Sequence, residues 1–135
     1  MFEYFPGNYV WNLGVVAALN SGGLIDEVDR ACRPIREIAR KGEDVGTPDF
    51  LRAWTALTDQ LVAQAELAER EGRTRTAGQT YFRATNYLCQ TERMLARSAP
   101  DRVPTYRRVL ELARKSFALR DPRVTSVLIG ASSVA

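Results

Sequence analysis

The sequence predicts an all-α protein of about five helices around an antiparallel helical hairpin, with a short strand-like C-terminal tail. Apolar residues recur at spacings of three and four through five segments of the 135-residue chain, as in helices with one buried face. Turns rich in glycine, serine or proline separate these segments. The β-branched, apolar run at 124–129 is typical of a buried strand. We therefore divide the chain into a helical, cap-like domain, residues 1–118, and an extended tail, residues 119–135.

The N-terminal segment combines aromatic residues with a helix start. Five of the twelve aromatic residues lie among the first eleven positions: Phe2, Tyr4, Phe5, Tyr9 and Trp11. Asn8 follows a Pro-Gly pair and is suited to cap a helix that runs to Asn20. The rings either pin an N-terminal arm onto the core or form the wall of an apolar ligand pocket, in which tyrosine hydroxyls would orient the ligand.

The second helical segment covers residues 24–41 and contains a proline. Its predicted inner stripe consists of Leu24, Val28, Ala31, Ile35 and Ile38. Pro34 lacks a backbone donor and is expected to kink or split this helix.

The central hairpin covers residues 47–97 and gives the strongest structural prediction. The inner face of its first helix is formed by Phe50, Trp54, Leu57, Leu61, Ala65 and Ala68, and that of the second by Ala77, Tyr81, Ala84, Leu88 and Leu95. Thr47 is expected to cap the first helix, and Pro48 suits its first turn. Gly72 is expected to end that helix in the left-handed conformation, which costs glycine little.

The last helical segment follows Asp101, a suitable capping residue. Its spacing places four residues inward: Tyr106, Leu110, Ala113 and Phe117. The strand-like run after it has no partner strand in an otherwise helical chain, so its backbone groups would stay unpaired. The tail is therefore interpreted as truncated or fused.

Composition excludes several kinds of chemistry. The chain contains no histidine, which excludes a self-contained Ser-His-Asp or Cys-His unit and removes the commonest ligand of catalytic zinc. Cys32 and Cys89 lack the spacing of metal ligands and are expected to be buried free thiols. We predict no catalytic residue, no metal site and no cofactor within the chain.

The charge pattern and the apolar runs limit the partners. Residues 99–135 carry seven basic and three acidic groups, but no nucleic-acid-reading motif accompanies this excess, so nucleic-acid binding is not expected. The longest apolar run, residues 13–19, is too short to cross a membrane. The N-terminus carries Glu3 where a signal peptide would be basic. A cytoplasmic protein without a membrane partner is therefore expected.

Several short motifs resemble the N-terminal helical region of an α/β-hydrolase family that includes FrsA-like esterases, dihydroxypseudooxynicotine hydrolase and fungal polyketide-shortening hydrolases. They are residues 5–11 (FPGNYVW), 20–23 (NSGG), 31–34 (ACRP) and, after Gly72, 80–87 (TYFRATNY). The resemblance covers residues 2–117 and implies a helical cap over an active site. The catalytic serine, acid and histidine would come from a following domain, before which this chain stops.

Residues 121–133 (DPRVTSVLIGASS) are similar to the last barrel strand and following loop of aldo-keto reductases. This second resemblance implies that Ser132 and Gly130 would lie near a cofactor phosphate. The barrel and its catalytic residues are not recognisable, so cofactor binding is not expected. The turn is also no hydrolase nucleophile elbow, since Val134 stands where G-x-S-x-G requires glycine.

The leading hypothesis is a detached cap and substrate-binding segment of an α/β-hydrolase. It would act on ester or carbon–carbon bonds of a small apolar or aromatic substrate only with the missing catalytic domain, and would be inactive alone. The candidate pocket residues are Tyr4, Tyr9, Trp11, Asn86 and Tyr87. The alternatives are a helical protein-interaction module, although no 34-residue repeat is present, and an aldo-keto reductase fragment. Without its catalytic domain, the chain is expected to form a homo-oligomer through the N-terminal aromatic residues.

Overall fold

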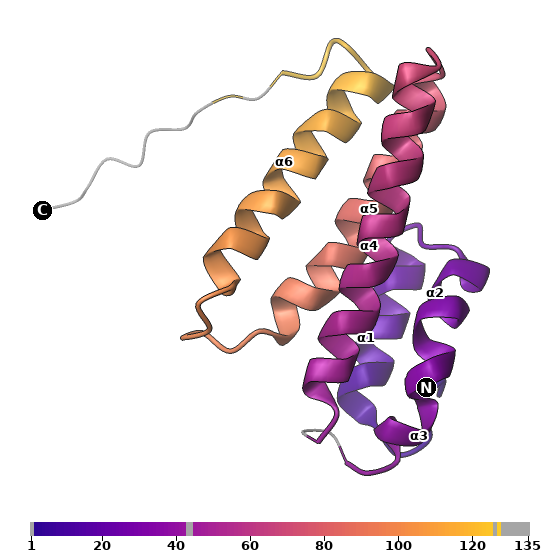
Figure 1. Cartoon of the computed structure of the whole chain (residues 1–135), viewed down its shortest axis with the longest axis vertical. Helices are drawn as coiled ribbons and strands as arrows, with labels where there is room; N and C mark the ends of the chain where they lie inside the picture. The colour runs from indigo at the N-terminus through magenta and orange to yellow at the C-terminus, as the bar shows by residue number, and fades with distance from the viewer. Residues whose placement is uncertain (1, 43–44, 126, 128–135) are drawn as a thin grey trace, which may run out of the picture.

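The computed structural model describes residues 2–42, 45–125 and 127, and confirms the all-α prediction (Figure 1). No strand occurs among these residues. Three of the six positions of the strand predicted at 124–129 lie outside them, as do Gly130 and Ser132. The main helices are α1 Tyr9–Asn20, α2 Ile25–Cys32, α4 Thr47–Arg70, α5 Thr74–Met94 and α6 Arg102–Arg120; the short turns η1 Arg33–Ile35 and α3 Arg36–Ala39 lie between α2 and α4.

The predicted hairpin is formed by α4 and α5 (Figure 1). Gly72 ends the first helix with φ of 74°, in the left-handed region. The N–H of Arg73 donates to the carbonyl of Ala68 at 2.8 Å, and the N–H of Gly72 donates to that of Glu69 at 3.0 Å. These two bonds satisfy carbonyls that the helix end would leave unpaired, so Gly72 fixes the reversal of the chain.

The prediction that Thr47 caps α4 is wrong. Thr47 is already helical, and Gly46 occupies the cap position without a side-chain hydrogen bond. A β-carbon at Gly46 would lie 2.8 Å from Cη2 of Trp11 and 2.5 Å from Cγ2 of Ile38. Close packing against Trp11 and Ile38 therefore requires glycine at this position.

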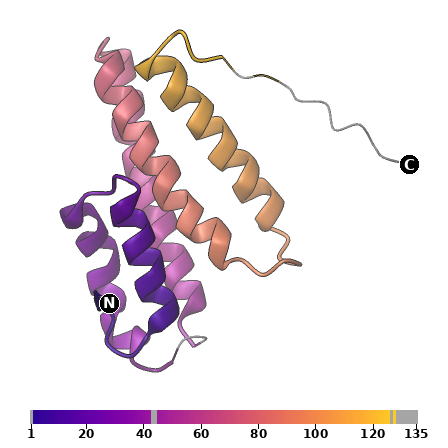
Figure 2. The same cartoon turned by 180° about the vertical axis from the view of Figure 1, so that it is seen from behind.

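The other helices pack on two sides of the hairpin. Viewed from behind, α1, α5 and α6 lie side by side with α4 beyond them (Figure 2). The α6 helix packs on α5. It reaches α4 through the ion pairs Arg108–Asp59, at 2.6 Å, and Lys115–Glu69, at 3.5 Å.

The centre of the core is a series of aromatic rings that joins the N-terminus to the hairpin. Neighbouring rings have centroids 5.0, 5.2, 5.1, 5.6 and 5.8 Å apart, in the order Tyr4, Phe5, Trp11, Phe50, Trp54 and Tyr87. Such spacings are typical of tilted and edge-to-face aromatic packing. The N-terminal aromatic residues thus include three that belong to the core, while Phe2 and Tyr9 remain exposed.

Two buried asparagines hold the N-terminal arm in place. Oδ1 of Asn12 accepts the N–H groups of Tyr4 and Phe5 at 2.9 and 2.8 Å, and its Nδ2 donates to the Phe5 carbonyl at 2.8 Å. Asn8 caps α1 as predicted, because its Oδ1 accepts the N–H of Trp11 at 3.1 Å. The arm therefore satisfies its backbone groups through side chains.

The segment at 24–41 is split at Pro34, as predicted: α2 ends at Cys32 and η1 and α3 follow. Its predicted inner stripe is wrong at Leu24, which is 45% exposed. Cys32 and Ala39 are buried although the stripe omitted them. Leu24 is the N-cap residue before the first turn of α2, and Cys32 lies one helical turn after the buried Val28. Only Ala39 lies beyond η1, where the change in helical period shifts the buried positions from those of one continuous helix.

The predicted inner face of α6 is also wrong. Tyr106 and Phe117 are 51% and 45% exposed, and the buried residues are Val109, Leu112 and Ser116. Asp101 occupies the N-cap position, but its side chain makes no capping bond.

The orientation of α6 about its axis differs from the predicted one because of its contact with Gly78 of α5. Oγ of Ser116 donates to the carbonyl of Gly78 at 2.8 Å. A β-carbon at Gly78 would lie 3.0 Å from Cβ of Leu119 and 2.8 Å from Cγ of Arg120. The absence of a side chain at Gly78 therefore allows the side of α6 that carries Ser116 to pack against α5. Tyr106 and Phe117 consequently face outward.

Candidate functional site

The five candidate pocket residues do not line a single cavity. Tyr4, Trp11 and Tyr87 belong to the ring series of the core, and Tyr9 is 58% exposed on the outer side of α1. Asn86 is buried, where its Nδ2 donates to the Ala18 carbonyl at 2.8 Å. Asn86 thus links α5 to α1.

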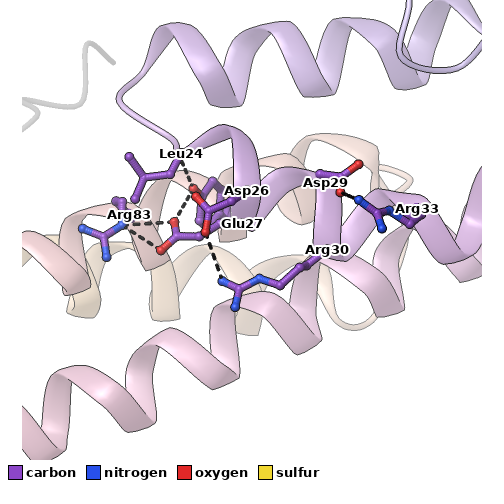
Figure 3. Close-up of polar contacts among 8 residues, drawn as sticks. Leu24, Asp26, Glu27, Asp29, Arg30, Arg33 and Arg83 are labelled. Atoms are coloured by element: carbon purple, nitrogen blue, oxygen red, sulfur yellow. Dashed lines mark hydrogen bonds and ion pairs between the residues drawn. The ribbon is translucent and has the colours of Figure 1, made fainter.

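Glu27 and Arg83 form a polar network that joins α2 to α5 (Figure 3), and its third member is Tyr87. Its hydroxyl donates to Oε2 of Glu27 at 2.6 Å and accepts the N–H of Leu24 at 2.9 Å. Nε of Arg83 donates to both carboxylate oxygens of Glu27, at 3.1 and 3.0 Å. Burial, reinforced by the bond to Glu27, raises the pKa of Tyr87 well above its ordinary value. Tyr87 is therefore held as a neutral donor to Glu27.

Tyr4 makes a similar contact with α2. Its hydroxyl donates to Oδ1 of Asp29 at 2.5 Å, and the Arg36 guanidinium lies 4.3 Å from the centre of its ring. Burial and the bond to Asp29 raise the pKa of Tyr4 to about 12. Hydrogen bonds from Tyr4 and Arg33 lower the pKa of Asp29. Sequence reasoning missed the roles of Glu27, Asp29 and Arg83, because Asp29 lies 25 positions from Tyr4 and Glu27 lies 56 positions from Arg83.

These tyrosine contacts predict destabilisation at high pH. Burial also raises the pKa of Tyr81, so Tyr4, Tyr81 and Tyr87 all ionise later in the folded state than in the unfolded state. The folded state therefore binds more protons than the unfolded state above about pH 10. The contribution of these tyrosines to the free energy of unfolding is fully present below this pH, and it is lost as pH rises toward 12. Circular dichroism and tyrosinate absorbance, followed in one titration, should show helix loss coinciding with ionisation of these residues. Complete tyrosine ionisation with intact helices would contradict the prediction.

Both cysteines are unsuited to act as nucleophiles. Cys32 is fully buried and Cys89 is half-buried. Burial raises the pKa of each thiol, which disfavours the reactive thiolate. Among the residues that the structure describes, no group of three or more Cys, Asp or Glu side chains could hold a metal ion.

A hollow of about 660 Å³ lies between α4, α5 and the N-terminal half of α6. Leu51, Leu88 and Pro104 supply apolar lining from these three parts of the chain. The ion pair between Arg108 and Asp59 lies at its edge. Its volume is in the range of small-ligand sites, although none of the candidate pocket residues lines it.

The outer side of α1 carries an apolar surface. We define the α1 outer face as Tyr9, Leu13, Val16 and Ala17, which share one side of the helix by their spacing. Leu13 is 42% exposed, and Val16 and Ala17 are half-buried. The helix contains no charged residue along its twelve positions.

Comparison with known proteins gives no relative. No family model, no curated protein and no solved structure matches the chain. In the described part of the chain, no helix combines the length and the apolar character needed to span a membrane.

Proposed function

We propose that the chain is a helical cap that binds an α/β-hydrolase catalytic domain, helps to bind a small apolar or aromatic substrate and has no turnover alone. The α1 outer face is the observation that supports this proposal most directly. The catalytic serine, acid and histidine belong to the partner domain, since this sequence contains no histidine.

The α1 outer face has the chemistry of a covered surface. A helix that is apolar on all sides is normally buried, whereas a surface helix has a polar outer side. The inner side of α1 is fully buried at Trp11, Val15 and Ala18. Its outer side offers Tyr9 and Leu13 to solvent instead of charged groups. Exposed apolar patches of this kind mark interaction sites, so we assign this face to the catalytic domain.

The motifs that resemble the hydrolase family build the same region. Residues 5–11 form the end of the N-terminal arm and the first turn of α1, with Phe5, Asn8 and Trp11 buried. Gly23, in the second motif, packs so closely that a β-carbon would lie 2.7 Å from the Ala18 carbonyl oxygen and 2.9 Å from Cε1 of Tyr87. The resemblance thus falls on residues that hold α1 against α5, as expected for the scaffold of a cap.

In this proposal, the hollow between α4, α5 and α6 is the part of the cap that binds the substrate. Its lining is mainly apolar, and Thr55 and Thr91 supply hydroxyls 3.4 Å apart. An apolar body with one polar group matches this lining. The substrate would reach the catalytic serine only after the partner domain has docked.

Reconstitution in trans tests this function. A family catalytic domain without its own helical segment is mixed with the purified chain, and p-nitrophenyl ester hydrolysis is measured. The chain alone should give no turnover above background, whereas the mixture should exceed the catalytic domain alone. Leu13→Glu should abolish the gain, because a carboxylate on the α1 outer face would lose its solvation on docking.

Leu67→Glu is the matched control, since Leu67 is 47% exposed on α4, away from the α1 outer face. It should leave the gain intact. An absent gain with the natural sequence, or equal loss in both variants, would overturn the proposal.

We also propose that the chain associates with itself, and sedimentation equilibrium tests this. Phe5 and Trp11 are fully buried and cannot form its interface as first expected, so Leu13→Glu should dissociate any oligomer.

A further inference from the structure

We propose that α5 and α6 form a second binding surface, which accepts an acidic amphipathic helix of a partner protein. This inference goes beyond the hydrolase-cap function and uses residues outside the α1 outer face. We define the α5–α6 face as the outward stripe of α6, Val103, Tyr106, Leu110, Ala113 and Phe117, together with Phe82 and Cys89 of α5.

The stripe on α6 is apolar and uncovered. Its members follow spacings of three and four, so they share one side of the helix. Val103, Tyr106 and Phe117 are 57%, 51% and 45% exposed, and the other two members are half-buried. The neighbouring side of α6, with Val109 and Leu112, already packs in the fold. The helix therefore has two apolar sides, of which the fold covers one.

Two hollows lie on the face, one at the Phe117 end of the stripe and one on the α5 part. A hollow of about 530 Å³ is lined by Phe117 with Arg75 and Gln79 of α5. Another, of about 420 Å³, is lined by Phe82 and Cys89 between α5 and the end of α1. Hollows of this size can receive protruding side chains from a helix, as in helix-in-groove recognition.

The charges around the face are basic and unpaired. Five exposed arginines of α5 and α6 form no ion pair within the described parts of the chain: Arg75, Arg93, Arg107, Arg114 and Arg120. The Arg120 guanidinium instead lies 4.6 Å from the centre of the Phe82 ring. Of the carboxylates nearby, Glu92 pairs with Arg102 and Asp121 pairs with Arg123. Glu111 of α6 is exposed between Arg107 and Arg114 without an ion pair among the described residues, so five arginines face one free carboxylate. The complementary partner has an apolar centre and an acidic rim.

The geometry favours a helix as this partner. The stripe extends from Val103 to Phe117, which is about 21 Å at 1.5 Å per residue, or about four helical turns. Leucines on one side of a helix would fill the hollows, while flanking glutamates would meet Arg75 on α5 and Arg114 on α6. An anionic bilayer is flat and would leave the hollows beside Phe82 and Phe117 unfilled.

The test uses the full chain and a synthetic helical peptide of about 20 residues, with leucines along one side and glutamates at both flanks. Fluorescence anisotropy should show binding that weakens as salt is raised. A peptide with lysine in place of glutamate should not bind. Arg114→Glu should weaken binding about tenfold, because it places like charges opposite one another. Phe117→Ser should weaken it by a similar factor.

Lys41→Glu is the control, because it makes the same charge change at an exposed position after α3. It should leave binding unchanged, and circular dichroism of all variants should match that of the natural chain. Equal binding of both peptides, or equal loss in Arg114→Glu and Lys41→Glu, would overturn the proposal. So would binding to phosphatidylserine-containing vesicles in the absence of peptide binding, which would assign this face to a membrane surface.

Discussion

Trp11→Ala is expected to lower the free energy of unfolding by about 3–5 kcal/mol, the usual cost of removing a large buried ring. Trp11 is fully buried between the rings of Phe5 and Phe50, with centroid distances of 5.2 and 5.1 Å. Gly46 packs against the edge of the indole ring. The surroundings of Trp11 therefore come from two segments, the N-terminal arm and the start of α4, which cannot both move into the vacated space.

Chemical denaturation followed by circular dichroism measures this effect, and Phe2→Ala is the matched control. Phe2 belongs to the same N-terminal aromatic run but is 57% exposed, so its removal should change stability by less than about 0.5 kcal/mol. Trp11→Phe should cost less than Trp11→Ala, because Nε1 of Trp11 has no hydrogen-bond acceptor among the described residues. Equal effects of Trp11→Ala and Phe2→Ala would show that the arm does not belong to the core.

Glu27→Ala is expected to cost about 3 kcal/mol, because it removes the partner of a mostly buried cation. The Glu27 and Arg83 side chains are 6% and 21% exposed. The substitution would leave Arg83 without its carboxylate and the Tyr87 hydroxyl without its acceptor. The remaining exposure of Arg83 places the cost at the low end of the range for buried pairs.

The double variant Glu27→Met with Arg83→Met separates attraction from desolvation. Replacing both charges with apolar side chains should restore much of the stability lost in Glu27→Ala. Glu37→Ala removes the partner of Arg40 in an exposed ion pair and should cost less than about 1 kcal/mol. Similar losses in Glu27→Ala and Glu37→Ala would contradict a structural role for the network.

Local signals explain which parts of the fold could be predicted. The hairpin follows from the apolar period of each helix and from Gly72, whose left-handed conformation is a property of one residue. The cap at Asn8 and the break at Pro34 are equally local. All of these depend on residues within a few positions of one another.

Contacts between distant residues explain what could not be predicted. The orientation of α6 depends on Gly78, 38 positions before Ser116, and both sides of α6 have a plausible apolar period. Among the candidate pocket residues, Tyr87 was chosen because it is both polar and aromatic. Its partner Glu27 could not be identified, because Glu27 lies 60 positions away in the sequence. Contacts between residues so far apart in the sequence cannot be predicted from the spacing of neighbouring residues.

The attachment of α6 to one side of α5 implies an uneven distribution of stability along the chain. Its links to α4 are the exposed ion pairs of Arg108 and Lys115, which contribute little each. Local unfolding can therefore release α6 while the aromatic core between α1, α4 and α5 stays intact. A helix bound to the α5–α6 face would raise the free energy of that opening, so occupancy of the surface would be coupled to the order of α6 itself.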